Sequence, residues 1–223
     1  ARNGDEGLKD YPGAKNAPGV WQTIINNIPP HDTFVECFAG SAAITLHKRP
    51  AVAAIVIDSD AAVAVVLARR LPFAEVLNTD AVGWLAKSSE DGRRVIYCDP
   101  PYLHSVRAVP GRRYYRHEFG EDEDHEKLLR VLRCIKSPVL LSGRRCELYD
   151  RWLEDWRRVD YQTSTHGGPV TESLWCNFPV PIALHDYRFL GRDFRERERI
   201  KRKLSRWRAR LARMPILERR LLS

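Results

Sequence analysis

Residues 99–102, Asp-Pro-Pro-Tyr, combine a carboxylate, a restricted backbone and a flat aromatic side chain. The exocyclic amine of a nucleobase is a poor nucleophile, and it needs acceptors for its N–H groups before its lone pair can turn toward a methyl donor. The carboxylate of Asp99 and the carbonyl of Pro100 can accept those hydrogens, and the proline pair restricts the backbone. Tyr102 offers a face on which a flipped base can stack. The motif predicts methylation of an amino group by positioning and electrostatics.

A glycine-containing turn, Phe-Ala-Gly-Ser-Ala at residues 38–42, directly follows an apolar run. Small residues let the backbone approach a ligand, so the turn predicts a nucleotide-type cofactor site that involves Glu36, Phe38 and Gly40. Close packing of the following helix is the alternative explanation of the same residues.

Three further aspartates follow two of the expected strands. Asp58 lies 18 positions after Gly40, and Asp60 lies 20 positions after it, which is the spacing at which an acidic residue reaches ribose hydroxyls. Asp58 is the preferred candidate, although either residue can cap the next helix. Asp80 follows the third strand, where it can accept a hydrogen bond from a bound adenine or cap a helix.

The elements that position these residues follow from the alternation of apolar runs with amphipathic stretches, which predicts an α/β sheet with helices on both faces. Short, continuous apolar strands suit a buried parallel sheet, so Asp99 is expected at the carboxyl end of a central strand, where such sheets bind ligands. Glycines 167 and 168 predict a hairpin between the last two strands. The expected strands are residues 33–37, 52–57, 75–78, 94–98, 138–142, 160–164 and 173–178; the expected helices are 18–27, 41–48, 61–71, 81–87, 124–134 and 145–153.

Residues 103–123 form a 21-residue connection, which is long for a compact domain and predicts a functional loop. Its interleaved cationic and aromatic side chains predict phosphate contact and base stacking, with a flexible surface loop as the alternative. These candidate nucleic-acid contacts are Arg107, Arg112, Arg113, Tyr114, Tyr115 and Arg116.

The composition fits one globular domain in a chain of 223 residues, 43% hydrophobic and 30% charged. No apolar run approaches the ~20 residues of a membrane helix, so we expect a cytoplasmic protein that does not bind membranes. The five cysteines form no Cys-x-x-Cys pair, and no metal site is expected.

The net charge of +8 is concentrated at the carboxyl end. Residues 185–223 contain fourteen Lys or Arg and five Asp or Glu, a net charge of +9, which indicates either a polyanionic partner or a solvated helix face. Pro215 should end or kink this helix. Its apolar stripe predicts packing on the body or on a second subunit in a homodimer, and comprises Ile200, Leu204, Trp207, Leu211 and Met214.

In this combination and order, the residues resemble the Dam-like DNA adenine-N6 methyltransferases, especially short phage and prophage members. Tyr11 to Lys15, Tyr-Pro-Gly-Ala-Lys, resemble the family's N-terminal motif, which contributes to the cofactor pocket; residues 38–42 resemble the cofactor-binding turn, and residues 99–102 resemble the catalytic motif. The resemblance covers about residues 11–178. Other matching phrases contain Tyr114, Tyr115, Glu118, Asp124, His125, Leu141, Ser142, Gly143, Glu172, Trp175 and Asn177.

This resemblance implies a single Rossmann-like methyltransferase domain with a seven-stranded, mostly parallel sheet and one antiparallel strand. We place this domain at residues 1–182 and a basic helical extension at 183–223. The resemblance also implies S-adenosylmethionine as cofactor, with Asp58 near its ribose and Asp80 near its adenine. A target adenine of double-stranded DNA would be flipped onto Asp99 and Tyr102.

The chain departs from the family pattern at several places. Ala42 and Ala14 stand where glycine is frequent, and only 18 residues separate Asp80 from Asp99. This spacing leaves little room for the large recognition segment of well-studied members, so site recognition falls to residues 103–123 or to the extension, or is relaxed. Alternatives are methylation of RNA adenine or of cytosine N4, and a non-catalytic DNA-binding protein with a methyltransferase-like body. Restriction-modification, phage defence against restriction and regulation are all open as biological roles.

Overall fold

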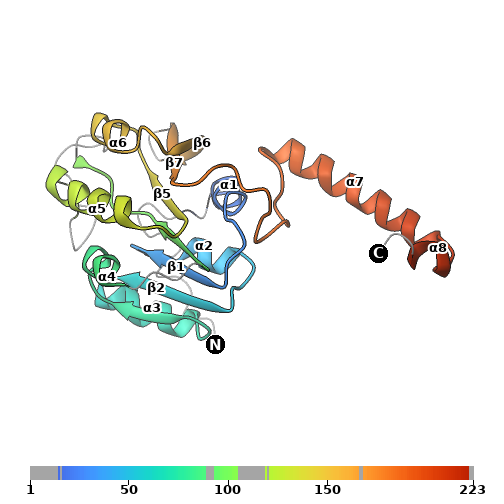
Figure 1. The fold of residues 1–223 in the computed structure, drawn as a ribbon, viewed down its shortest axis with the longest axis horizontal. Helices are drawn as coiled ribbons and strands as arrows, with labels where there is room; N and C mark the ends of the chain where they lie inside the picture. Colours follow the sequence, from blue (N-terminus) through green and yellow to red (C-terminus); the bar gives the residue numbers. More distant parts are fainter. Residues whose placement is uncertain are drawn as a thin grey trace.

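The computed structural model describes residues 15, 17–88, 93–104, 119, 121–165 and 168–220. These residues form a sheet flanked by helices and a long helix that extends away from it (Figure 1). In chain order the elements are α1 (Val20–Ile25), β1 (Thr33–Cys37), α2 (Ala43–His47), β2 (Ala53–Asp58), α3 (Ala61–Arg70), β3 (Glu75–Asn78), α4 (Ala81–Lys87), β4 (Arg94–Cys98), α5 (Asp122–Cys134), β5 (Val139–Gly143), α6 (Glu147–Trp152), β6 (Arg157–Thr165), β7 (Gly168–Cys176), α7 (Phe194–Arg213) and α8 (Ile216–Arg220).

The sheet has seven strands in the order β3-β2-β1-β4-β5-β7-β6. Neighbouring strands from β3 to β5 are parallel, and β7 runs antiparallel to both β5 and β6. The predicted Rossmann-like sheet with one antiparallel strand is therefore confirmed. The order reverses at β1 and β4, and the crevice outside the carboxyl ends of such strands is where open α/β sheets bind ligands.

Helices cover both faces of the sheet. Helices α1, α2 and α3 pack on one face, where Phe34 of β1 and Val56 of β2 are fully buried. Helices α4, α5 and α6 pack on the other, against alternate residues such as Val35, Ile96 and Trp175. Central strands β1, β4 and β5 thus need apolar side chains on both faces, which explains their nearly continuous hydrophobic runs.

The predicted elements are all present, and their bounds shift where the backbone has a special conformation. Helix α2 starts at Ala43 rather than at residue 41, because Gly40 and Ala42 adopt left-handed backbone angles, with φ of 51° in each case. Strand β6 extends beyond its predicted range at both ends, and β7 starts five residues earlier and ends two residues earlier than predicted, because their hairpin pairs nine positions, from Arg157 with Cys176 to Thr165 with Gly168.

Residues 185–191 anchor the carboxyl-terminal segment to the body before α7 begins. His185 donates its backbone N–H to the carbonyl of Ile28 at 3.0 Å, and Asp186 accepts the N–H of Arg49 at 2.8 Å. The side chain of Asn26 in turn donates to the carbonyl of Gly191 at 3.1 Å. Helix α7 begins after this anchor, and as expected it ends just before Pro215. Among the described residues, no helix is long and apolar enough to cross a membrane.

Asn177 links the end of β7 to the start of β5. Its Oδ1 accepts the N–H of Val139 at 2.7 Å, and its Nδ2 donates to the carbonyl of Ser137 at 3.0 Å. We predict that Asn177→Ala lowers the free energy of unfolding by about 2 kcal/mol, because it removes both partners from a half-buried turn. Urea denaturation measures this loss. Gln162→Ala, on an exposed face of β6, is the control and should change stability by less than about 0.5 kcal/mol; equal losses in the two variants would contradict the role of Asn177.

Candidate active site

Asp99 follows β4 at the carboxyl edge of the sheet, as predicted, and its backbone N–H donates to the carbonyl of Cys37 in neighbouring β1 at 3.4 Å. Pro100 is buried beside it. The side chain of Asp99 is 17% exposed, which leaves the carboxylate reachable from the crevice while most of it is shielded from water.

Lys15 is the centre of a buried polar group that we call the Lys15 cluster: Lys15, Asp99, Tyr102, Tyr161 and Glu172. The ammonium Nζ of Lys15 lies 2.8 Å from Oδ1 of Asp99 and 3.4 Å from Oε2 of Glu172. It also donates to the hydroxyl of Tyr102 at 2.8 Å, and that hydroxyl donates to Oε1 of Glu172 at 2.6 Å. The hydroxyl of Tyr161 donates to the other Glu172 oxygen at 3.2 Å.

The electrostatics of the cluster set the protonation of Asp99. The pKa of Asp99 is raised to about 6, chiefly by burial and also by the carboxylate of Glu172, against the opposing effect of the Lys15 charge. Burial lowers the pKa of Lys15, but the charges of Asp99 and Glu172 outweigh this and hold it well above its ordinary value. Lys15 therefore stays a cation, and Asp99 is predominantly ionised at neutral pH.

Tyr102 is held in place by its hydroxyl rather than by packing alone. The two hydrogen bonds to Lys15 and Glu172 fix the ring at the mouth of the cluster, and the guanidinium of Arg144 lies 5.3 Å from the ring centre. An electron-rich ring beside a cation is a stable cation–π arrangement. The ring is only half-buried, so part of it is available to a flat ligand.

The turn after β1 has the backbone of a ligand-binding loop. Phe38, Gly40 and Ala42 all have positive φ angles, of 56°, 51° and 51°. For two residues with side chains this conformation is strained, and such strain gathers at functional sites. The ring of Phe38 packs on Phe119 with ring centres 5.1 Å apart.

Asp58 ties this turn to β2. Its Oδ2 accepts the N–H of Gly40 at 2.8 Å, and its Oδ1 accepts the N–H of Asp60 at 2.9 Å. Asp60 caps α3 by accepting from Ala62 at 2.8 Å. The structure thus brings the predicted pair Gly40 and Asp58 into contact and gives Asp60 the capping role.

The carboxylate of Glu36 faces α2. It accepts the backbone N–H groups of Ile44 and Thr45, at 3.4 and 2.7 Å, and the hydroxyl of Thr45. Burial raises the pKa of Glu36 to about 7 even though these hydrogen bonds lower it. Glu36 therefore supports the start of α2, directly after the glycine turn.

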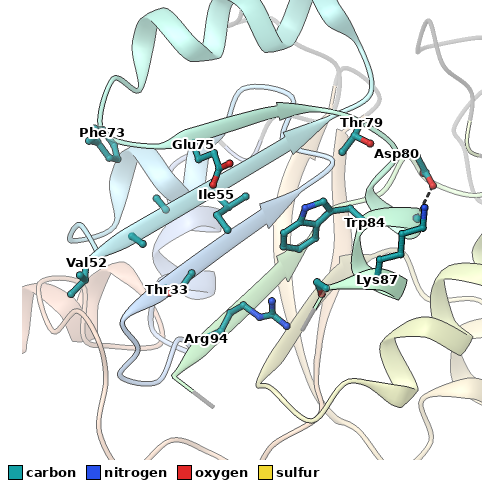
Figure 2. Close-up of a pocket in the computed structure, with 14 residues that line it drawn as sticks. Thr33, Val52, Ile55, Phe73, Glu75, Thr79, Asp80, Trp84, Lys87 and Arg94 are labelled. Atoms are coloured by element: carbon teal, nitrogen blue, oxygen red, sulfur yellow. Dashed lines mark hydrogen bonds between the residues drawn. The ribbon is translucent and has the colours of Figure 1, made fainter. Parts of the chain in front are cut away.

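Asp80 caps α4, accepting from the backbone N–H groups of Val82 at 3.3 Å and Gly83 at 2.7 Å. Figure 2 shows Asp80 and Thr79 at one end of an open pocket of about 950 Å³ and Val52 and Phe73 at the other. This pocket is the part of the sheet face that the seven-residue α4 leaves uncovered. The expected contact of Asp80 with a cofactor adenine stays a prediction.

Several predicted site residues lie outside the described residues. These are Tyr11 of the N-terminal motif and the candidate nucleic-acid contacts Arg107, Arg112, Arg113, Tyr114, Tyr115 and Arg116. Among the residues that the structure does describe, no group of three or more His, Cys, Asp or Glu side chains could hold a metal ion.

Local sequence does not point to Glu172, Tyr161 or Arg144 as site residues. Of the three, only Glu172 lies in a phrase that resembles the family. Glu172 is 5% exposed inside a strand, and an acidic residue in an otherwise apolar run is the signal that could have identified it. Lys15, which the motif predicts to contribute to the cofactor pocket, contacts the carboxylate of the catalytic motif, and its contact with a cofactor stays a prediction.

Comparison with known families fits this arrangement. Residues 65–166 match the model of the D12 class N6 adenine-specific DNA methyltransferases. The resemblance to the Dam-like adenine methyltransferases is confirmed. The matched segment contains Asp80, Asp99, Tyr102 and Tyr161, whereas the glycine turn and Glu172 lie outside it. No curated protein matches the chain.

Two of the solved structures with a similar fold have different names. One is a precorrin 8w decarboxylase of Methanobacterium thermoautotrophicum, with 13% identity and a TM-score of 0.48 over 77% of this chain and 95% of the other. The second is a dimethyladenosine transferase of Plasmodium falciparum, with 16% identity and a TM-score of 0.45 over 72% of this chain and 60% of the other.

The buried Glu36 predicts a pH-dependent stability. Its pKa is about 7 in the folded protein, above the ordinary value of 4.5, so its contribution is favourable at low pH and is lost as the pH rises toward 7. We expect wild-type protein to lose about 3 kcal/mol relative to Glu36→Gln between about pH 4 and about pH 8. Urea denaturation across this range measures the difference between the two proteins; parallel curves would show that Glu36 does not titrate in this window.

Proposed function

We propose that this chain transfers a methyl group from S-adenosylmethionine to N6 of an adenine flipped out of double-stranded DNA. The observation that carries the proposal is the buried ion pair of Lys15 and Asp99 at the end of β4, where Asp99 lies in the segment that matches the D12 class. A carboxylate kept ionised beside an accessible aromatic ring is suited to a flat base with an exocyclic amine.

The residues around the glycine turn fit S-adenosylmethionine, which supplies an electrophilic methyl group on a sulfonium centre. The strained turn at Phe38 and Gly40 lies at the switch point of the sheet, where open α/β sheets bind ligands. Asp58 would accept hydrogens from the ribose, since each carboxylate oxygen keeps a second lone pair, and Asp80 lies at the end of β3 for the adenine. Glu36 acts through α2 by shaping the turn, and we retain Tyr11 and Lys15 as candidate contacts of the cofactor.

Asp99 and the carbonyl of Pro100 would accept the two hydrogens of the target amine and aim its lone pair. Tyr102 would stack on the base. Lys15 cannot serve as a general base, because its raised pKa keeps it protonated. Its role is to hold Asp99 ionised and to fix the hydroxyl of Tyr102, with Glu172 as the second anchor. Catalysis then comes from positioning and electrostatics.

Incubation of the purified protein with labelled cofactor and unmethylated duplex DNA tests this proposal, with nucleoside mass spectrometry as readout. N6-methyladenine in DNA supports it. If the product is N4-methylcytosine, or if only adenine of an RNA offered in parallel is methylated, the proposed substrate is wrong and the proposed chemistry of the site is retained. Absence of cofactor binding in calorimetry would favour the non-catalytic alternative and overturn the proposal.

Removal of the central carboxylate should separate chemistry from binding. We expect Asp99→Ala to lower the rate of methyl transfer by about 10³-fold, because the amine loses an acceptor at the reacting centre. Duplex affinity should stay within about twofold, since one shielded carboxylate adds little to phosphate contact. Asp32→Asn, at an exposed ion pair, is the control for the loss of one negative charge. Substantial activity in the Asp99 variant would exclude the assigned mechanism.

Removal of the Lys15 charge and removal of the Glu172 charge should shift the pH profile of methyl transfer in opposite directions. In the wild type, kcat/KM should fall as the pH drops below about 6, because protonated Asp99 is a much weaker acceptor for its hydrogen of the target amine. Lys15→Met removes the charge that lowers the pKa of Asp99, so the acid limb moves to higher pH. Glu172→Gln removes a charge that raises this pKa, so the limb moves to lower pH. Shifts in the same direction in both variants would contradict this electrostatic assignment.

A further inference from the structure

Helix α7 extends away from the rest of the protein as a separate rod (Figure 1). It spans twenty residues and none of them is buried. Leu204 and Trp207, in the middle of the predicted apolar stripe, are 47% and 51% exposed, so the described part of the chain leaves this section of the stripe uncovered. Isolated helices need tertiary contacts or a partner for most of their stability. The length of α7 therefore points to a partner.

The charge of α7 indicates what kind of partner it fits. The helix contains ten Lys or Arg residues and two Glu residues, a formal charge of +8, which equals the net charge of the whole chain. Glu196 pairs with Arg199 at 3.2 Å, and Glu198 pairs with Lys201 at 3.7 Å. Residues 202–213 then contain six basic side chains and no acidic one. A surface of this kind attracts polyanions.

The arginines of α7 are arranged in a line rather than scattered. Six of them recur at spacings of four, three, four, four and three residues, which places them along one side of the helix. With a rise of 1.5 Å per residue, the line is about 27 Å long. The members of this arginine line are Arg195, Arg199, Arg202, Arg206, Arg210 and Arg213.

A second copy of the helix and a membrane surface fit this pattern less well. Pairing two copies of α7 along the apolar stripe would bring two charges of +8 together, which is unfavourable. A helix that lies on a membrane surface needs a broad apolar face, whereas only four residues of the apolar stripe lie within α7, and they form a narrow stripe with basic residues on both sides. Duplex DNA carries a charge for every ~1.7 Å of its axis, a density that matches a continuous line of guanidinium groups.

We propose that the arginine line of α7 binds the phosphate backbone of duplex DNA, without reading sequence, and holds the protein on its substrate. This inference rests on the proposed function for the choice of DNA. The segment that precedes α7 is anchored near the carboxyl end of α1 and the start of β2, whereas Asp99 lies at the carboxyl edge of the strands. Helix α7 therefore holds a part of the duplex separate from the one at the catalytic edge.

Two charge-matched variants test the line directly. Arg202→Gln with Arg206→Gln removes two members of it, and Lys201→Gln with Arg208→Gln removes two cations from the other side of the same turns. Fluorescence anisotropy with a duplex of about 40 base pairs, at several salt concentrations, gives the slope of log Kd against log salt. Loss of two phosphate contacts should reduce this slope by about 1.8 for the line variant and by less than half as much for the control.

The outcomes separate this inference from the proposed function. If the slope changes in the line variant but no DNA acquires N6-methyladenine, the DNA contact of α7 is supported and the proposed function is wrong. Methylation of DNA with equal slopes in both variants defeats the α7 inference and leaves the proposed function intact. The inference would be overturned if the arginine line binds duplex RNA or anionic vesicles more tightly than DNA. It would also be overturned if the free protein is a dimer that Trp207→Ala dissociates and the line substitutions leave intact.

Discussion

The contact between the ammonium of Lys15 and the carboxylate of Asp99 decides how the rest of the site is arranged. Both groups are largely withdrawn from water, and neither charge would be tolerable there alone. The pair holds the segment before α1 against the end of β4. Glu172, which lies in β7, provides a second carboxylate for the ammonium group of Lys15. Tyr102 and Tyr161 fill the remaining positions of the network. The segment before α1, the end of β4 and strand β7 thus meet because one cation needs several acceptors, and Tyr161 of β6 joins them through Glu172.

A network of this kind fixes geometry more than it adds stability. Desolvation of a buried ion pair commonly offsets much of the attraction between its charges. The main effect of the network is therefore that it selects one arrangement of the site's side chains over others. For Tyr102 the consequence is direct, since a hydroxyl with two partners fixes the direction of its ring. A preorganised ring and carboxylate need little rearrangement when a base arrives, and preorganisation of this kind is the main source of electrostatic catalysis.

Much of the fold and part of the site could be predicted from local sequence. The strands at 33–37, 75–78 and 94–98 are predicted at their observed bounds, because each is a short stretch that contains apolar residues and is followed by a turn or a helix-capping aspartate. Asp99, Gly40 and Asp58 follow strand ends, so topology alone brings them to one edge. Glu172 and Tyr161 could not be placed in this way, because their role depends on the pairing of β7 with β5 and β6 across the sheet. The open pocket beside Asp80 likewise depends on how much of the sheet the short α4 covers.

The reversed direction of β7 has a consequence for how the chain tolerates additions. The chain enters β7 near the catalytic edge, where Glu172 meets Lys15, and leaves it at the opposite edge, where Asn177 contacts the start of β5. Everything after β7 is therefore tethered on the far side from Asp99. A fluorescent protein or an affinity tag fused behind α8 would stay clear of the crevice, whereas one fused in front of Lys15 would begin close to a residue that is itself part of the site.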